Sequence, residues 1–192
     1  LIDLLGYTFS RGRMLSLVEK DESQYESAKK ILWSSGAAMM VNEKMFKALG
    51  GFDGDYFAHQ EEIDLCWRIQ RAGGNIWYEP KSRIYHLGGG TMEYTNPRKI
   101  FLNFRNNLST IFKNVPYIYL FILLPFRLMI DFLISIKYLL SGQFILFFKV
   151  IEAYVISILS TLYLMHKKDH YNSMIEKAKI GPTQFAGLLR GS

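Results

Sequence analysis

The sequence predicts an α/β fold in its first 114 residues, followed by hydrophobic and amphipathic helices that associate with a membrane. In the first part, short apolar runs that are typical of strands alternate with helical patterns and glycine-containing turns. From Tyr117 to Met165 the chain is mostly apolar instead. We therefore place a boundary at residues 114–116, between a mixed α/β portion (1–114) and a helical membrane-associating region with a basic tail (115–192).

The charge is divided unevenly between the two halves of the chain. The net charge of +6 combines −2 in residues 1–96 (11 Lys and Arg, 13 Asp and Glu) with +8 in residues 97–192 (12 and 4). Because the basic residues of the second half are scattered among apolar runs, they favour an anionic membrane surface over nucleic acid as the partner. The single cysteine, Cys66, excludes an internal disulfide and a cysteine-based zinc site, so a reducing compartment is permitted.

The first elements of the chain are a loop and a weak helix over residues 7–30. Arg11 and Arg13 are candidates for contacts with phosphate groups of a ligand, and the alternative is that both are simply solvated. A short strand at residues 31–33 then leads into a turn of small residues (34–38), which lets a ligand approach the backbone closely. The alternative for this turn is a tight crossing in the core.

Two further helices are predicted by their capping residues. Asn42 can cap a helix over residues 43–49, and Asn96-Pro97 is a strong start for an amphipathic helix that continues to about Lys113. Three polar residues in the second of these helices, Arg105, Asn106 and Asn107, lie on its less apolar side, and the sequence assigns them no chemistry.

The central feature of the sequence is an acidic helix that begins at about Glu61 and ends at Gly73-Gly74, where a left-handed C-cap needs a residue without Cβ. Its first turn carries Glu61, Glu62 and Asp64, at the positive end of the helix dipole. On a helical wheel, Glu62 continues the buried-facing stripe. Glu61, Asp64 and Arg68 share a neighbouring face, with Asp64 and Arg68 spaced to form an i,i+4 pair.

Glu62 is therefore the candidate general base. The helix dipole favours its ionised form even when the carboxyl is partly desolvated, as a base that works near pH 7 requires. The alternative is that acids at a helix N-terminus only cap the helix.

A histidine and a glycine run follow the acidic helix. We expect short strands at residues 76–78 and 84–86, so that His86 lies at the end of a strand beside flexible backbone. An imidazole in this place suits a divalent metal, and the backbone N–H groups of Gly88 and Gly89 can approach a phosphate. The alternative is a structural histidine.

Several of these motifs occur together in an order that resembles a known family. They are Trp33-Ser34-Ser35-Gly36-Ala37-Ala38, Gly50-Gly51-Phe52-Asp53, Phe57-Ala58-His59-Gln60-Glu61-Glu62-Ile63-Asp64-Leu65-Cys66-Trp67-Arg68, Gly73-Gly74, Pro80 and Tyr85-His86. Over about residues 7–112, this series resembles the acceptor half of family 2 glycosyltransferases, which are inverting enzymes of the GT-A fold. The resemblance is strongest to the rhamnosyltransferase-like members that act in bacterial envelope polysaccharide pathways.

The resemblance implies roles for individual residues. It identifies Glu62 as the catalytic base, although the family commonly has Asp there, with Glu61, Asp64 and Arg68 beside it. His86 is implied as a ligand of a divalent metal, Mg²⁺ or Mn²⁺. The turn that contains Trp33, Ser35, Gly36 and Ala37 is implied to line the sugar and acceptor site.

The resemblance also implies a missing part. The family's nucleotide-binding half, with its strand-borne Asp-x-Asp, should precede these motifs, so we expect this chain to be the C-terminal portion of a longer enzyme. Asp53-Gly54-Asp55 matches Asp-x-Asp literally, but it lies in the acceptor half and is interpreted as a loop.

The apolar region predicts a pair of hydrophobic helices joined by a turn at Ser141-Gly142. Its longest uncharged runs have 13 residues, fewer than the roughly 20 that a membrane span needs. The charged residues interrupting it are spaced to pair, as Arg127 with Asp131 and Lys149 with Glu152. These features favour helices that lie in the interface or dip into it. A charge-paired transmembrane hairpin and a soluble dimerisation bundle are the alternatives.

The expected function is inverting transfer of a sugar from a nucleotide-sugar donor to a saccharide, lipid-linked acceptor at the cytoplasmic face of the bacterial inner membrane. Lys167 and Lys168 are expected at the lipid headgroups. Nucleic acid is not expected as a partner, and a homodimer is possible. The alternative function is a non-catalytic membrane-anchoring or scaffold module with a glycosyltransferase-like fold.

Overall fold

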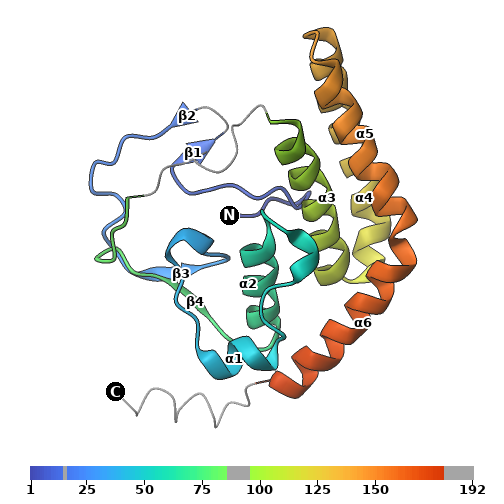
Figure 1. The fold of residues 1–192 in the computed structure, drawn as a ribbon. Coiled ribbons are helices and arrows are strands. Elements are labelled where there is room, and N and C mark those ends of the chain that lie inside the picture. The colour runs from blue at the N-terminus through green and yellow to red at the C-terminus, as the bar shows by residue number, and fades with distance from the viewer. Residues whose placement is uncertain (15–16, 86–95, 180–192) are drawn as a thin grey trace, which may run out of the picture.

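The computed structural model describes residues 1–14, 17–85 and 96–179. The strands are β1 (Arg13–Met14), β2 (Leu17–Val18), β3 (Lys29–Ile31) and β4 (Ile76–Tyr78), and the 3-10 turns are η1 (Gly36–Ala38) and η2 (Gly54–Tyr56). The α-helices are α1 (Glu43–Ala48), α2 (Glu61–Arg71), α3 (Pro97–Asn114), α4 (Tyr117–Leu140), α5 (Phe144–Leu159) and α6 (Thr161–Ala178). In Figure 1 the strands lie to one side of α2, and α3, α4 and α5 lie to the other.

The described strands form two antiparallel pairs. In the first pair Arg13 lies opposite Val18, and in the second Lys29 lies opposite Tyr78. Helices dominate the rest, so the described residues have an α/β composition with small sheets. β4 confirms the strand predicted at residues 76–78. The strand predicted at residues 84–86 does not form at residues 84 and 85, and His86 lies outside the described residues.

The prediction of a weak helix within residues 7–30 is wrong. Within the described part of this segment, the chain forms β1, β2 and turns instead. Asp21 Oδ1 accepts from the backbone N–H of Ser23 at 3.0 Å, and Gln24 Nε2 donates to the carbonyl of Lys20 at 2.7 Å. Such local side-chain bonds satisfy backbone groups outside a helix, so they compete with helix formation.

α2 lies at the centre of the molecule (Figure 1). It ends where predicted, because Gly73 adopts a φ of 90°, which a residue with a Cβ rarely takes. The buried face of α2 packs into a hydrophobic core whose fully buried members come from α1, α2 and α6. They are Leu49, Leu65, Ile69, Ala72 and Ile175.

The last helix, α6, returns to the α/β portion instead of staying with the apolar hairpin. Ile175 of α6 shares the core with Leu49 and Leu65, although it is far beyond the predicted boundary at residues 114–116. The expectation that Lys167 and Lys168 lie at lipid headgroups is wrong. Lys167 pairs with Asp53 at 2.5 Å, and Lys168 Nζ donates to the carbonyl of Phe112 at 3.0 Å and to that of Val115.

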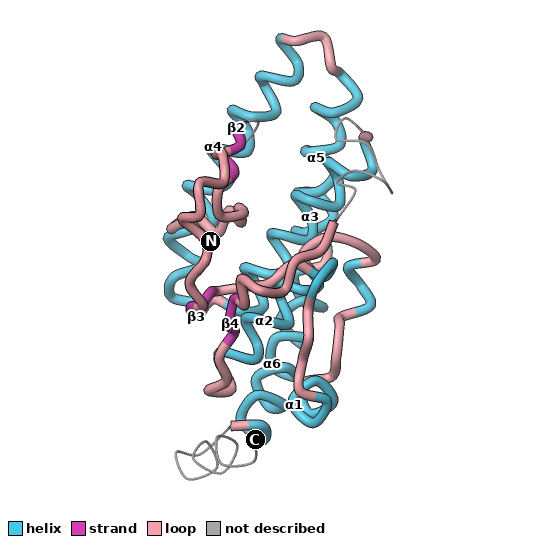
Figure 2. The backbone as a smooth tube through the Cα atoms, turned by 90° about the vertical axis from the view of Figure 1, so that its left-hand side faces the viewer, coloured by secondary structure: helices cyan, strands magenta, loops and turns pink. Residues whose placement is uncertain are grey.

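α4 and α5 form the predicted hairpin, with a turn at Ser141 and Gly142. In Figure 2 this turn lies at one end of the molecule, away from α1 and the described end of α6. Both predicted ion pairs form: Arg127 Nε lies 2.8 Å from Asp131 Oδ2, and Lys149 Nζ lies 2.5 Å from Glu152 Oε2. By length and hydropathy, α4 could cross a membrane, and so could α5 with α6 as one pair bent by 65°.

Candidate functional site

The turn of small residues lies directly against the start of α2. Ser35 caps η1 by accepting from the backbone N–H of Ala37 at 3.3 Å. At the next residue, Gly36, an added Cβ would lie 3.8 Å from the Cβ of Glu62. The structure therefore brings together Glu62 and the turn that the sequence predicted to line a ligand site.

The carboxylate of Glu62 is partly buried and incompletely paired. Burial raises its pKa above the usual value of a glutamate, and the neighbouring charge of Glu61 adds to this effect. The backbone N–H groups of Glu62, Ile63 and Gly36 act in the opposite direction, but only partly. A carboxyl with a raised pKa is a stronger base, so the environment suits proton abstraction from a hydroxyl.

Three polar atoms at this end of α2 are buried without a hydrogen-bond partner among the described residues. They are Glu61 Oε2, Glu62 Oε2 and His59 Nε2. Burial also lowers the pKa of His59, with a contribution from Lys99, against the opposing effect of Glu61. A buried polar atom without a partner is destabilising, so a ligand that bonded these atoms would be stabilised by them.

The loop that leads into α2 has an unusual backbone. Phe57, His59 and Gln60 adopt φ values of 62°, 69° and 76°, in a region where residues with a Cβ are uncommon. Asn106 of α3, which is buried, holds this loop through its side-chain amide. Nδ2 donates to the carbonyl oxygens of Tyr56 at 3.0 Å, of Ala58 at 2.8 Å and of His59 at 2.8 Å.

The neighbours of Asn106 support the same loop. Arg105 Nε donates to Asn106 Oδ1 at 2.8 Å, and Arg105 Nη2 donates to the carbonyl of Asp55 at 2.8 Å. Asn107 Nδ2 donates to the carbonyl of Gly6 at 3.0 Å. No role was predicted from the sequence for Arg105, Asn106 or Asn107. The two adjacent amides on this amphipathic helix were the available signal, because buried amides need partners.

Asp64 and Arg68 form the predicted i,i+4 pair, at 2.9 Å, but in the interior of the protein. Their side chains are 0% and 1% exposed, so Asp64 is the innermost acid of α2 and Glu62 is not. The helical wheel was wrong here because α3 supplies partners for Asp64. Lys113 Nζ lies 3.1 Å from its Oδ1, and Asn114 Nδ2 donates to the same atom at 2.9 Å.

Arg68 ties α2 to the segment before it. Its Nη2 donates to the carbonyl of Gly51 at 2.8 Å, and its Nη1 donates to that of Leu49. Arg68 and Asp64 therefore position α2 and do not face a ligand. Their role in orienting the wall that holds Glu62 stays a prediction.

Other candidates lie apart from these contacts. Trp33 Nε1 donates to the carbonyl of Leu1 at 3.1 Å, and Arg11 lies 4.4 Å from the ring centre of Tyr25. Arg13 is exposed in β1. The predicted metal ligand, His86, and the predicted phosphate-binding residues, Gly88 and Gly89, lie outside the described residues.

The Asp53-Gly54-Asp55 sequence is a short turn whose acids are paired with lysines. Asp53 caps η2 and lies 2.6 Å from Lys113 and 2.5 Å from Lys167. Burial opposes ionisation of Asp53, but these two ammonium groups outweigh it and hold its pKa well below the usual range. Asp55 pairs with Lys167 and accepts from Tyr163 Oη at 2.7 Å.

No group of three or more His, Cys, Asp or Glu within the described ranges could hold a metal ion. The lysine partners of Asp53 and Asp55 are consistent with the interpretation of this sequence as a loop.

No protein-family model and no solved structure matches the chain. Segments of it are similar to curated glycosyltransferases. The N-acetylglucosaminyl-diphospho-decaprenol L-rhamnosyltransferase of Mycobacterium tuberculosis is 33% identical over 67 residues, which cover 35% of this chain and 22% of that protein. Rhamnosyltransferase WbbL of Escherichia coli is 39% identical over 54 residues, covering 28% and 20%.

A third relative comes from an archaeon. The low-salt glycan biosynthesis hexosyltransferase Agl10 of Haloferax volcanii is 24% identical over 95 residues, which cover 49% of this chain and 31% of that protein. The matched segments therefore span less than a third of each relative's length. All three relatives are named for the transfer of a hexose or a rhamnose, so the similarities support a glycosyltransferase family for this chain.

Proposed function

We propose that this chain carries the acceptor side of an inverting glycosyltransferase of the family 2, GT-A type, in which Glu62 is the general base. The observation that carries the proposal is the partly buried carboxylate of Glu62 with an unpaired Oε2, set against the turn at Gly36. The similarity to rhamnosyl- and hexosyltransferases favours sugar transfer as the reaction. Backbone N–H groups at the start of α2 also bond the Glu62 carboxylate, as in capping, but they leave its Oε2 without a partner among the described residues.

In the proposed reaction, Glu62 takes the proton from a hydroxyl group of the saccharide acceptor. The acceptor oxygen then forms a bond to the anomeric carbon of the nucleotide-sugar donor from the side opposite the leaving group. The bond between that carbon and the nucleoside diphosphate breaks, and the diphosphate leaves with the electron pair. Attack from the opposite side inverts the configuration of the sugar, and the proton stays on Glu62.

The other residues of the site have supporting roles in this proposal. Glu61 raises the pKa of Glu62 through its charge. Asp64 and Arg68 fix α2 from behind, and Asn106 fixes the loop in front of it. Each of them acts through Glu62 and none of them reacts.

The turn of small residues and the basic residues of the N-terminal segment belong to substrate binding in this proposal. Ser35, Gly36 and Ala37, with Trp33, would line the acceptor and donor sugar, while Arg11, Arg13, Gly88 and Gly89 would contact donor phosphates. A divalent cation, Mg²⁺ or Mn²⁺, would offset the charge on the departing diphosphate when bound, with His86 as one ligand.

Because the donor-binding half is expected to precede this chain, the chain alone is expected to be inactive, and the test is turnover of a Glu62→Gln variant of the full-length enzyme. Turnover is measured as release of nucleoside diphosphate from a panel of nucleotide-activated hexoses and rhamnose with Mg²⁺ or Mn²⁺. We expect a loss on the order of a hundredfold or more, with donor binding retained, because the amide accepts no proton. Glu43→Gln on exposed α1 is the matched control and should retain activity. Full activity of Glu62→Gln would remove Glu62 as the base.

We also propose that the α4–α5 hairpin enters one leaflet of a membrane. Its outer part exposes a continuous set of large apolar side chains: Leu128, Met129, Phe132, Leu133, Leu140, Phe144, Ile145 and Phe148. The base of the hairpin is held by the body of the protein, where Arg127 Nη1 donates to the carbonyl of Leu5 at 3.0 Å. Asp131 accepts from Tyr154 Oη at 2.6 Å and from Tyr7 Oη.

This geometry limits how far the hairpin can reach. The part of α4 beyond Arg127 has a length of about 20 Å at 1.5 Å per residue, whereas the hydrocarbon core is about 30 Å thick. The proposal thus places the site at a membrane surface, in agreement with a lipid-linked acceptor and with the cytoplasmic face of a bacterial inner membrane.

Flotation with phosphatidylethanolamine and phosphatidylglycerol vesicles tests the membrane proposal. Phe132→Glu combined with Phe148→Glu should weaken vesicle binding by at least a hundredfold. Each phenylalanine would be buried in the lipid, and losing two such side chains costs roughly 3–6 kcal/mol. Phe52→Glu, on an exposed phenylalanine of the body, is the control. Unchanged flotation of the double variant would refute insertion of the hairpin.

A further inference from the structure

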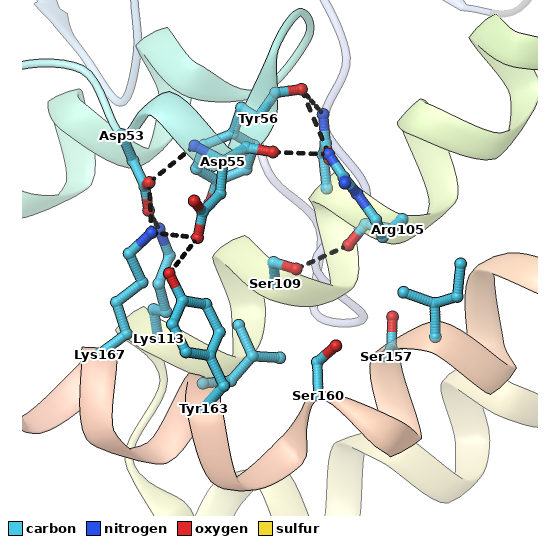
Figure 3. A pocket seen from close by; sticks show the side chains of 13 residues that line it. Asp53, Asp55, Tyr56, Arg105, Ser109, Lys113, Ser157, Ser160, Tyr163 and Lys167 are labelled. Carbon is cyan, nitrogen blue, oxygen red and sulfur yellow. Dashed lines mark hydrogen bonds and ion pairs between the residues drawn. The ribbon is translucent and has the colours of Figure 1, made fainter.

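A cavity of about 310 Å³ lies between α3 and the bend where α5 meets α6 (Figure 3). Its end is closed by η2, through Asp53, Asp55 and Tyr56. Cavities that bind small ligands start at about 300 Å³, so this one has room for a single sugar-sized unit. None of the predicted site residues that the structure describes lines it.

The walls of the cavity carry hydroxyl groups from both sides. In Figure 3 the side chains of Ser157 and Ser160 point from the bend toward α3. Ser109 Oγ donates to the carbonyl of Arg105 at 2.9 Å, and Ser157 Oγ donates to that of Ala153 at 2.8 Å. Because their hydrogens are used inside their own helices, these oxygens can offer lone pairs to a ligand. The ligand must therefore bring hydrogen-bond donors.

The charges around the cavity nearly cancel. Lys113 and Lys167 are paired with Asp53 and Asp55 at the closed end, which leaves Arg105 as the charge without a carboxylate partner among the described residues. Bonds from Arg105 Nε and Nη2 go to Asn106 Oδ1 and to backbone carbonyls. These bonds do not use its Nη1, which can therefore donate to an oxygen of a ligand.

This chemistry distinguishes a neutral sugar from a phosphate. A phosphate is anionic and mainly accepts hydrogen bonds, so it would use Arg105 but face the lone pairs of Ser109 and Ser157 and the carboxylate of Asp55. A sugar hydroxyl both donates and accepts, so it can use all of these groups. Ile156, Leu164 and the ring of Tyr163 add apolar surface for the C–H face of a sugar.

The cavity is linked to the proposed catalytic site through one residue. Asn106 lines the cavity and also donates to the carbonyl oxygens of Ala58 and His59, in the loop that leads to Glu61 and Glu62. We propose that this cavity is a second saccharide-binding site, which takes a neutral sugar unit of the acceptor that does not itself react. The role in the acceptor rests on the proposed function, whereas binding of a sugar can be measured by itself.

The test is saturation-transfer NMR of the 192-residue protein with methyl α-L-rhamnoside, N-acetylglucosamine, D-glucose and D-galactose, and with inorganic phosphate as the anionic probe. We expect at least one sugar to bind at millimolar concentration and phosphate not to displace it. Ser157→Leu fills the cavity and should weaken binding at least tenfold, whereas Ser141→Leu, in the exposed turn of the hairpin, should not. Ser157→Ala removes the hydroxyl with little change in volume and should weaken binding without affecting folding.

Three results would overturn the proposal: absence of binding by all four sugars, binding that Ser157→Leu and Ser157→Ala leave unchanged, or displacement of the sugar by phosphate. Glu62→Gln separates the two proposals, because it should abolish turnover and leave binding in the cavity unchanged. If Glu62→Gln retained full turnover while Ser157→Leu still abolished sugar binding, the assignment of Glu62 as the base would be refuted. The proposal of a sugar site in the cavity would still be supported.

Discussion

Replacement of Lys113 by alanine tests the buried ion cluster that supports α2. The Nζ atom of Lys113 lies 2.6 Å from Asp53 Oδ2 and 3.1 Å from Asp64 Oδ1, and its side chain is 2% exposed. Without this ammonium group, the cationic partners left within the described residues are Lys167 for Asp53 and Arg68 for Asp64. Removing one partner of a buried pair costs about 3–5 kcal/mol of the free energy of unfolding. Because Lys167 and Arg68 remain beside the two aspartates, we expect a loss near the lower end, at about 3 kcal/mol.

Urea unfolding followed by tryptophan fluorescence measures this loss as a change in the free energy of unfolding. The matched control is Lys47→Ala, which removes an exposed i,i+4 pair with Glu43 and should cost at most about 0.5 kcal/mol. Combining Lys113→Ala with Asp53→Asn should cost less than the sum of the two single changes, because the amide no longer needs the ammonium group. A loss below about 1 kcal/mol for Lys113→Ala, or strict additivity in the double variant, would refute the cluster as a source of stability.

The same cluster predicts a pH dependence. The pKa of Asp53 is lower in the folded protein than its usual value, despite burial, because of Lys113 and Lys167. Its contribution is therefore present above about pH 4, the unfolded value, and is lost as the pH falls toward the folded value. The stability difference between the parent protein and Lys113→Ala should shrink as the pH falls below 4. A difference that stays constant to pH 2 would exclude Asp53 as the group responsible.

Further predictions concern α2 and the loop before it. Since activity requires ionised Glu62 and the charge of Glu61 raises the pKa of Glu62, Glu61→Gln should move the acid limb of the pH–rate profile to lower pH. Burial raises the pKa of the Cys66 thiol to about 11, so an aromatic disulfide reagent should label it only after unfolding, and rapid native labelling would contradict its buried position. Asn106→Ala should lower kcat more than it raises KM, because the loop before α2 loses its bonds to Asn106. Asn106→Gln should not restore kcat, because its longer side chain cannot place the amide nitrogen within reach of the same three carbonyl oxygens.

Local signals predicted where several of the helices begin or end. Asn96-Pro97 marked the start of α3, Gly73 the end of α2, and Ser141-Gly142 the turn of the hairpin, because capping and turn chemistry depend on neighbouring residues alone. The resemblance to a family singled out both Glu62 and the turn at Gly36, but their contact was found only in the structure. Periodicity did not predict how deeply each acid of α2 is buried, since that depends on partners from other elements.

The partners of charged residues could not be read from the sequence for the same reason. Lys167 follows Asp53 by more than a hundred positions, and a basic residue near an apolar run looks like a headgroup contact when its distant partner is unknown. α6 returns to the core because Ile175 and the neutralised Lys167 both fit there. Hydropathy and charge patterns identify the apolar and basic residues of this region, but they do not predict the long-range pairing of Lys167 with Asp53.

The distribution of unpaired atoms along α2 distinguishes a binding site from simple capping. Asp64, at the inner side of the first turn, has Arg68, Lys113 and Asn114 as partners, so burying it is compensated. Glu61 and Glu62, which precede Asp64 in the same turn, each leave a buried oxygen without a partner among the described residues. Each such atom costs about 1–3 kcal/mol, more when charged, and the same helix shows that partners can be supplied where the fold alone needs them. The unpaired oxygens are therefore better explained by groups that a substrate brings than by capping, and the loop held by Asn106 keeps them where a substrate can reach.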